Sequence, residues 1–153
     1  MVRVSGSARH ALSPDQVWAL TLGLLAVHQT EEVVYPIEAW LERVGSTGWP
    51  RLDAHVRGPS GTGNPLADAR ASRRLAVVGA QTLGAGALWA CARRSGRATR
   101  VLATGLCLGG AAAFAMHIAV SVRTRSVMPG LATSLVPGLP GAALTLCAIW
   151  ARA

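Results

Sequence analysis

The sequence has no lysine, little charge of either sign and few aromatic residues. Charged residues make up 14% of the 153 residues and hydrophobic residues 51%, whereas a typical soluble domain carries about 25% charge. Intrinsic disorder requires low hydrophobicity and high charge, so this composition excludes it. The shortage of charge also argues against an ordinary water-soluble enzyme.

Acidic residues are absent from the second half of the chain. All seven acids lie within residues 1–68, whereas residues 69–153 carry ten arginines and no acid. A basic excess is typical of nucleic-acid binding, of a membrane surface or of cytoplasmic loops. Because the arginines punctuate long uncharged runs and do not form one polar face with exposed aromatics, we expect no nucleic-acid partner.

Long uncharged runs dominate the remainder of the chain. Residues 75–92 and 126–151 contain no charged residue, and residues 101–122 contain none if His117 is neutral. A membrane-spanning helix needs about 20 mostly apolar residues, and abundant Gly and Ala suit close packing of helices in lipid. A soluble helical bundle is the alternative, but it requires charged outer faces, which these runs lack.

A fourth apolar segment begins at Ser13-Pro14-Asp15-Gln16, which is typical of a capped helix start. A cleaved signal peptide is disfavoured because no small-residue cleavage site follows the apolar residues 17–27. We therefore predict an all-α fold, a bundle of four transmembrane helices forming one membrane domain over residues 1–153, multi-pass in the cell membrane. The predicted helices cover about 14–36, 74–92, 100–122 and 130–151, with a polar loop at 41–73.

The first helix carries ionisable residues where lipid would surround it. His28, Glu31 and Glu32 follow an i, i+3, i+4 spacing, which places them on one helix face. A charge within a bilayer costs at least about 2.5 kcal/mol, so such groups face the bundle interior and find partners. If the four helices alternate in direction, His117 and the arginines at 123 and 125 lie at the same end of the bundle.

Two interpretations of this cluster follow from the spacing. In the first, His28, Glu32 and His117 bind a divalent metal, zinc or iron, because two imidazoles and a carboxylate are a common ligand set. Glu31 or Glu32 then acts as a general acid or base, and Arg125 joins the catalytic group. In the second, Glu31 and Glu32 form ion pairs with Arg123 and Arg125, and the cluster is a structural lock.

The residues His28-Gln29-Thr30-Glu31-Glu32 and a later block resemble the HXXEE-domain family of small multi-helix bacterial membrane proteins. The later block has a histidine in a helix, basic residues and then Pro-Gly-x-x-Thr, here His117, Arg123, Arg125 and Pro129 to Thr133. The chain departs from the family where Val127 replaces an aromatic residue and Gln81 an acid. The resemblance implies the membrane fold and the position of the site, but it implies no reaction.

Two functions remain open from the sequence. The first is a metal-dependent or acid–base enzyme acting on a lipid-like or isoprenoid substrate, because such a substrate reaches an intramembrane site from the bilayer. The second is a non-enzymatic membrane protein, such as a binding, transport-accessory or immunity-type protein, in which the His/Glu/Arg cluster is the structural lock. The lipid bilayer is a partner in both.

Overall fold

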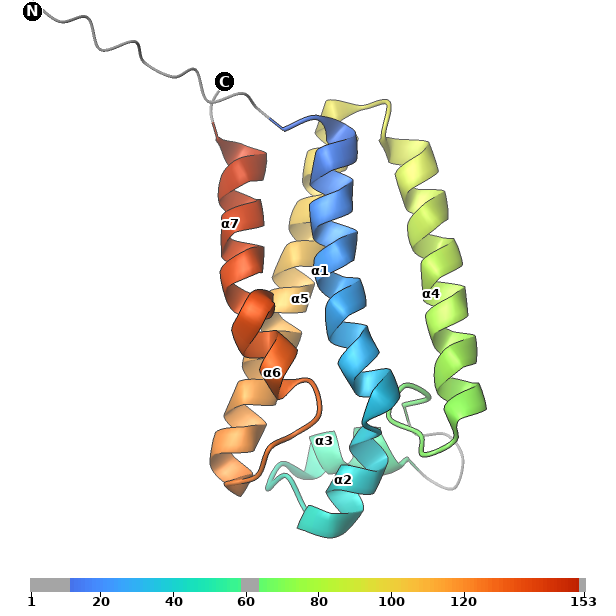
Figure 1. Cartoon of the computed structure of the whole chain (residues 1–153), viewed down its shortest axis with the longest axis vertical. Helices are drawn as coiled ribbons and strands as arrows, with labels where there is room; N and C mark the ends of the chain where they lie inside the picture. Colours follow the sequence, from blue (N-terminus) through green and yellow to red (C-terminus); the bar gives the residue numbers. More distant parts are fainter. Residues whose placement is uncertain (1–11, 59–63, 152–153) are drawn as a thin grey trace, which may run out of the picture.

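The computed structural model describes residues 12–58 and 64–151, and within these ranges the chain is helical without strands. Four long helices lie side by side and alternate in direction (Figure 1). Two short helices cover one end of this bundle, and the last long helix is preceded by a short irregular helical segment. The long helices are α1 (Pro14–Val34), α4 (Ala71–Ala92), α5 (Gly96–Thr124) and α7 (Leu139–Trp150); the short elements are α2 (Ile37–Val44), α3 (Pro50–Arg57), α6 (Leu131–Thr133) and η1 (Ser134–Gly138).

The start of α1 follows the local chemistry of its sequence. The Ser13 hydroxyl accepts the backbone N–H of Gln16 at 3.2 Å, and the Gln16 side chain accepts the backbone N–H of Ser13 at 2.9 Å. Pro14 occupies the first helical position, where its missing N–H costs nothing. The helix ends at Val34, before Pro36, since the residue preceding a proline disfavours helical geometry.

The structure corrects the predicted number of transmembrane helices from four to three. Helices α4 and α5 and the stretch Leu131–Trp150 are long and apolar enough to cross a membrane. Helix α1 has 21 residues but does not reach the same hydropathy, because His28, Gln29, Glu31 and Glu32 interrupt its apolar sequence. It nevertheless packs against α4, α5 and α7, so its polar residues lie among the apolar helices.

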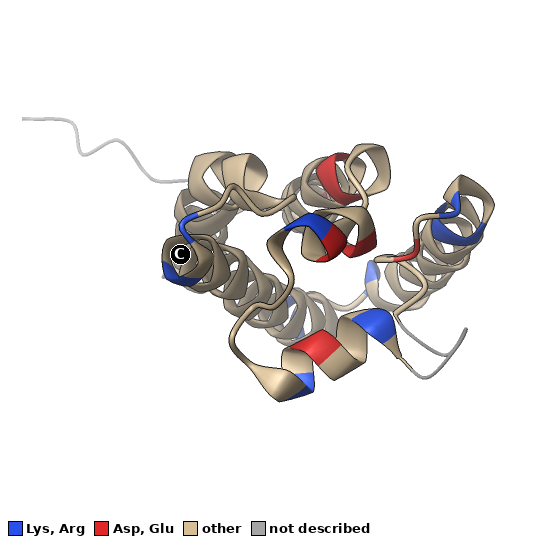
Figure 2. Cartoon of the chain, turned by 90° about the horizontal axis from the view of Figure 1, so that it is seen from below, with Lys and Arg blue, Asp and Glu red and all other residues tan. Residues whose placement is uncertain are grey.

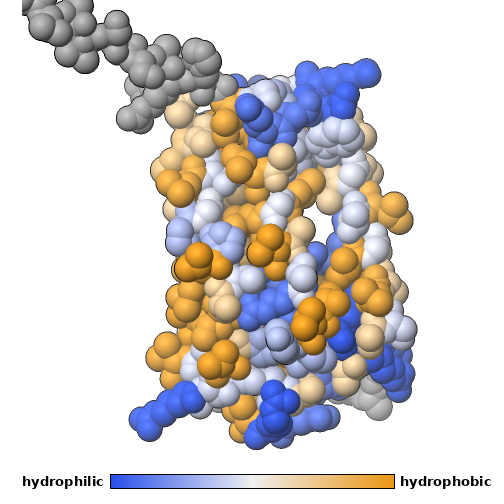
Figure 3. Space-filling view, in the orientation of Figure 1, coloured by the Kyte–Doolittle hydropathy of each residue, from blue (hydrophilic) through white to orange (hydrophobic). Residues whose placement is uncertain are grey.

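The surface also separates apolar regions from polar ones. Hydrophobic side chains cover much of the flanks of the long helices, and strongly hydrophilic ones gather at the two ends and in a patch between the helices in the lower half (Figure 3). Charged residues at the lower end lie on α2, α3 and the ends of the long helices (Figure 2). Helix α4 stands to one side of the bundle in both ribbon views, and most of its residues are exposed.

The predicted polar loop at 41–73 was wrong in part, because it contains the end of α2 and all of α3. Helix α2 has an apolar stripe of Ile37, Trp40, Leu41 and Val44, which is the spacing of one helix face. This stripe packs on the end of α5 and the following loop, and the Trp40 indole donates to the Ser126 hydroxyl at 3.0 Å. The two short helices therefore cover the lower end of the bundle.

The predicted continuous helix over 130–151 is interrupted. The backbone of Val136 is extended, with φ −146° and ψ 110°, and Pro137 follows it. Gly138 lies so close to the Phe114 ring and the Thr133 carbonyl that an added Cβ would collide with the carbonyl oxygen, at 2.6 Å. The interruption separates α6 from α7 and places the start of α6 beside α1.

Candidate metal centre

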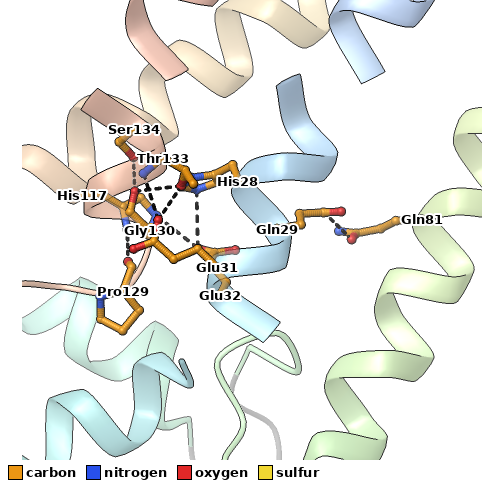
Figure 4. Close-up of polar contacts among 10 residues, drawn as sticks. All are labelled: His28, Gln29, Glu31, Glu32, Gln81, His117, Pro129, Gly130, Thr133 and Ser134. Carbon is orange, nitrogen blue, oxygen red and sulfur yellow. Dashed lines mark hydrogen bonds and ion pairs between the residues drawn. The ribbon is translucent and has the colours of Figure 1, made fainter. Parts of the chain in front are cut away.

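Three ionisable side chains meet between α1 and α5. His28 and Glu32 lie one turn apart on α1, and His117 comes from α5 (Figure 4). The Oε1 atom of Glu32 lies 3.1 Å from Nε2 of His117 and 3.7 Å from Nε2 of His28. Their exposed fractions are only 6%, 9% and 1% for His28, Glu32 and His117. We call these three residues the His/Glu cluster.

The backbone of the loop before α6 fixes the orientation of His117. Its Nδ1 atom lies 2.6 Å from the carbonyl oxygen of Pro129. Because a carbonyl oxygen can only accept, Nδ1 carries the proton and donates it. In the neutral imidazole the Nε2 atom of His117 then has a free lone pair, and this lone pair faces Glu32.

Thr133 fixes the orientation of His28 in the same way. The Thr133 hydroxyl donates to the Glu31 carboxylate at 2.7 Å, so its oxygen accepts from Nδ1 of His28 at 3.0 Å. The Nε2 atom of His28 is then the one with the lone pair, and it also faces Glu32. Two imidazole lone pairs and a carboxylate oxygen therefore converge, with their ligand atoms all within 4.8 Å of one another.

This arrangement matches the way proteins orient metal ligands. A metal-binding histidine almost always donates its other ring N–H to a carbonyl, carboxylate or similar acceptor, which fixes its tautomer. His117 and His28 both do so, through Pro129 and Thr133. Ligand atoms about 2.0–2.2 Å from a zinc ion lie roughly 3–3.5 Å apart, close to the separations of 3.1 and 3.7 Å from Glu32. The three ligand atoms span up to 4.8 Å, so the two imidazoles would have to move closer together to bind one ion.

Gly130 lets the loop approach both imidazoles. Its φ of 88° lies in the left-handed region, which favours glycine. A Cβ at this position would lie 2.7 Å from the His117 ring and 2.8 Å from Cε1 of His28. The Gly130 carbonyl also accepts the backbone N–H of Ser134 at 2.9 Å, so the loop is held to the start of η1.

Glu31 lies outside the His/Glu cluster although it is adjacent to Glu32 in the sequence. Its Oε2 atom accepts both the backbone N–H and the hydroxyl of Thr133, at 2.9 and 2.7 Å. The carboxylate thus caps the first turn of α6, as an N-cap side chain does within one helix. Glu31 positions Thr133, which in turn positions His28.

The two predicted arginine partners do not reach the acids. Arg123 turns toward the loop between α2 and α3, where it donates to the Gly48 carbonyl at 3.2 Å and lies 5.7 Å above the Trp49 ring. Arg125 ends α5 with a φ of 50° and is exposed. Throughout residues 12–58 and 64–151, neither Glu31 nor Glu32 forms an ion pair with an arginine.

Several residues of the site escaped sequence reasoning. Pro129 and Gly130 were noticed only as part of a motif, and Thr133 was given no role, although all three contact or approach the imidazoles. Their signal was the Pro-Gly pair, which marks a turn before a helix start, with a hydroxyl residue three positions after the glycine.

A second polar contact crosses the bundle beside this site. The Gln29 amide donates to the Gln81 carbonyl oxygen at 2.5 Å and links α1 to the otherwise loosely packed α4 (Figure 4). Gln81 therefore does not line the His/Glu cluster. It bridges two helices, because an unpaired amide among apolar helices is costly.

Comparison with known proteins identifies one family. Residues 18–145 match the family described as "Protein of unknown function with HXXEE motif". Both histidines, both acids and the Pro-Gly-x-x-Thr segment lie within the matched range. No curated protein and no solved structure matches the chain.

Proposed function

The chain belongs to the HXXEE family, and from the geometry of the His/Glu cluster we propose that it is a metal-binding membrane protein. His28, Glu32 and His117 hold one divalent cation, zinc or iron. The observation that carries this proposal is that both Nδ1–H groups are engaged by acceptors, so both Nε2 lone pairs point to Glu32.

A cation between these atoms resolves an electrostatic problem. With both Nε2 atoms unprotonated, three electron-rich atoms face one another in a buried site and repel unless a proton or a cation lies between them. The arginines that could have neutralised Glu32 lie elsewhere. A divalent ion bound by two imidazoles and one carboxylate offsets the repulsion.

The ligand set favours catalysis over a purely structural metal. Structural zinc sites are usually closed by four protein ligands, most often with cysteine, whereas two histidines and one carboxylate are typical of catalytic zinc and non-haem iron. Such an ion supplies Lewis-acid chemistry when bound. We infer a metal-dependent or acid–base enzyme, with Glu32 at the centre of the site and Glu31 holding Thr133 and His28 in place.

The surroundings of the site favour a lipid-like or isoprenoid substrate. The His/Glu cluster lies between helices of which three are apolar enough to cross a membrane. We place the protein in the cell membrane as a multi-pass protein whose partners are the bilayer and this substrate, with no nucleic acid. Arg125 is the least supported of the predicted catalytic residues, because it is exposed at the end of α5.

One observation favours a second candidate. The 3.1 Å separation between Glu32 and His117 is also a hydrogen-bond distance, so a shared proton can take the place of a cation. The cluster is then a structural lock between α1 and α5 in a non-enzymatic binding, transport-accessory or immunity-type protein. The arginines are not part of this lock.

Metal analysis of purified protein separates the two candidates. The protein is expressed in metal-replete medium, purified in lipid nanodiscs and analysed by inductively coupled plasma mass spectrometry. We expect close to one zinc or iron ion per wild-type chain, and a loss of most metal in His117→Ala and in Glu32→Gln. His55→Ala is the matched control, because His55 is exposed on α3 and lies outside the cluster. Metal-free wild-type protein that stays folded would favour the structural lock.

A further inference from the structure

An apolar groove runs along the outer face where the last turns of α1 meet α6. Val27, Thr30 and Val34 line it from α1, Tyr35 lines it directly after α1, and Ala132 lines it from α6. Its volume is about 490 Å³, within the range of about 300–1,000 Å³ that ligand pockets have. The groove is open to the outside of the bundle, so a molecule in the surrounding lipid can enter it from the side.

One charged group lies in this apolar groove. Glu31 and Thr133 complete its lining, and the Glu31 carboxylate is half-buried. Thr133 donates its N–H and its hydroxyl to this carboxylate, and the backbone N–H groups of Gly130 and Ala132 also point toward it. These donors all come from the side of α6, and the negative charge borders the apolar lining of the groove, where a group that donates a hydrogen bond is favoured.

The groove is connected to the His/Glu cluster through a single side chain. The Thr133 hydroxyl donates to Glu31 in the groove and accepts from Nδ1 of His28 in the cluster. A ligand that binds Glu31 therefore lies one hydrogen bond away from a residue that orients His28.

We propose that this groove binds a single-chain membrane amphiphile whose head group donates a hydrogen bond to Glu31, a hydroxyl or an amine. The hydrocarbon chain lies along Val27 and Val34, and the head group lies at Glu31 beside Thr133. An amphiphile with an anionic head group is disfavoured, because two like charges would meet at low dielectric. Naming this amphiphile as the substrate rests on the proposed function, whereas its binding in the groove does not.

Photo-labelling in nanodiscs tests the proposal. The probes are hexadecanol and hexadecanoic acid, each with the same diazirine and alkyne groups in the chain. We expect the alcohol to label peptides covering residues 27–35 and 131–134 about tenfold more than the acid. The alcohol donates a hydrogen bond to the charged Glu31, and a bond of this kind contributes about this much to binding. In Glu31→Gln this preference falls toward equality.

Matched variants separate the groove from the general lipid surface. Val34→Trp fills the groove and lowers labelling by the alcohol to background. Val122→Trp is the control, because Val122 is 73% exposed on α5 and does not line the groove; it labels as the wild type does. Equal labelling by both probes, or labelling spread evenly over α4 and α5, overturns the proposal. A cross-link between two copies at residues 27–35 also overturns it, because a second chain then fills the groove.

Failure of this proposal is distinguishable from failure of the metal site. Metal content is measured in the same samples, and Val34→Trp is expected to keep its metal because Val34 contacts no cluster residue through a hydrogen bond or ion pair. If the protein contains no metal but the alcohol labels it selectively, the amphiphile site is supported and the metal site is rejected. If the protein contains metal but both probes label it equally, the metal site is supported and the amphiphile site is rejected.

Discussion

Replacement of Gly130 by alanine tests how the loop before α6 holds the two imidazoles. The substitution has two costs. A left-handed conformation costs a non-glycine residue about 1–2 kcal/mol, and forcing extra atoms into a packed site costs about 1–3 kcal/mol. The second cost arises because the new Cβ would lie 2.7 and 2.8 Å from ring atoms of His117 and His28. We expect a total of about 2–5 kcal/mol, against a typical stability of about 5–15 kcal/mol.

Gly45→Ala is a control for backbone strain without contact with the imidazoles. Gly45 has almost the same φ, 89°, but its ψ of −48° lies outside the left-handed helical region that Gly130 occupies, and no atom lies within 4 Å of the position where its Cβ would be. Both variants should therefore lose stability in thermal unfolding in nanodiscs. Metal content should fall in Gly130→Ala and stay at the wild-type level in Gly45→Ala. If the two variants match in metal content, the loop does not position the imidazoles.

Three further substitutions test other contacts. Thr133→Val should reduce metal affinity about 10–100-fold, the usual effect of losing a group that orients a metal-binding histidine, whereas Thr133→Ser should retain it; isothermal titration with zinc measures both. Arg74→Gln should lower the melting temperature, because the buried Arg74 guanidinium donates to the carbonyls of Val33, Asp68 and Ala69, joining the end of α1 to the start of α4; a melting temperature equal to that of the wild type would reject this role. Asp53→Asn should be less stable than the wild type at neutral pH, and the difference should shrink at low pH; circular dichroism across a pH series measures both.

The sign of the Asp53 effect follows from its contacts. Partial burial raises the pKa of the Asp53 carboxyl, but hydrogen bonds from the Ser46 hydroxyl and from the hydroxyl and N–H of Thr47 outweigh it, and the folded pKa lies below its ordinary value. A depressed folded pKa stabilises the fold above the unfolded pKa, about 3.9. This stability is lost as the pH falls through the folded pKa, so acid weakens the turn between α2 and α3. An identical acid profile in Asp53→Asn would contradict this reasoning.

Much of the fold follows from local sequence rules. The capping box at Ser13 and Gln16 predicts the start of α1, and the long apolar runs predict α4 and α5. The prediction overcounted the transmembrane helices because helix length was weighed above the polar residues at the end of α1. The short helices α2 and α3 were missed because the segment was judged by its overall polarity, although Ile37, Trp40 and Leu41 form an apolar stripe.

The sequence predicts which residues form the candidate site, but it does not predict which hydrogen bonds hold them in place. Helix spacing places His28 and Glu32 on one face, and alternation of the helices brings His117 to the same end. The separate role of Glu31 depends on the interruption at Val136 and on where α6 begins, which no spacing rule gives. The contact of Arg123 could not be predicted either, because its partner, the Gly48 carbonyl, lies between α2 and α3, in a segment that was predicted as a polar loop.

X-ray absorption spectroscopy of the purified, metal-loaded protein tests the central claim most directly, because it reports the atoms bound to the ion. The His/Glu cluster predicts only nitrogen and oxygen ligands at about 2.0–2.2 Å with zinc, and the outer-shell scattering of two imidazoles. His117→Ala should remove one imidazole from this spectrum. A sulfur ligand at about 2.3 Å, or a spectrum without imidazole, would place the metal elsewhere and contradict the account.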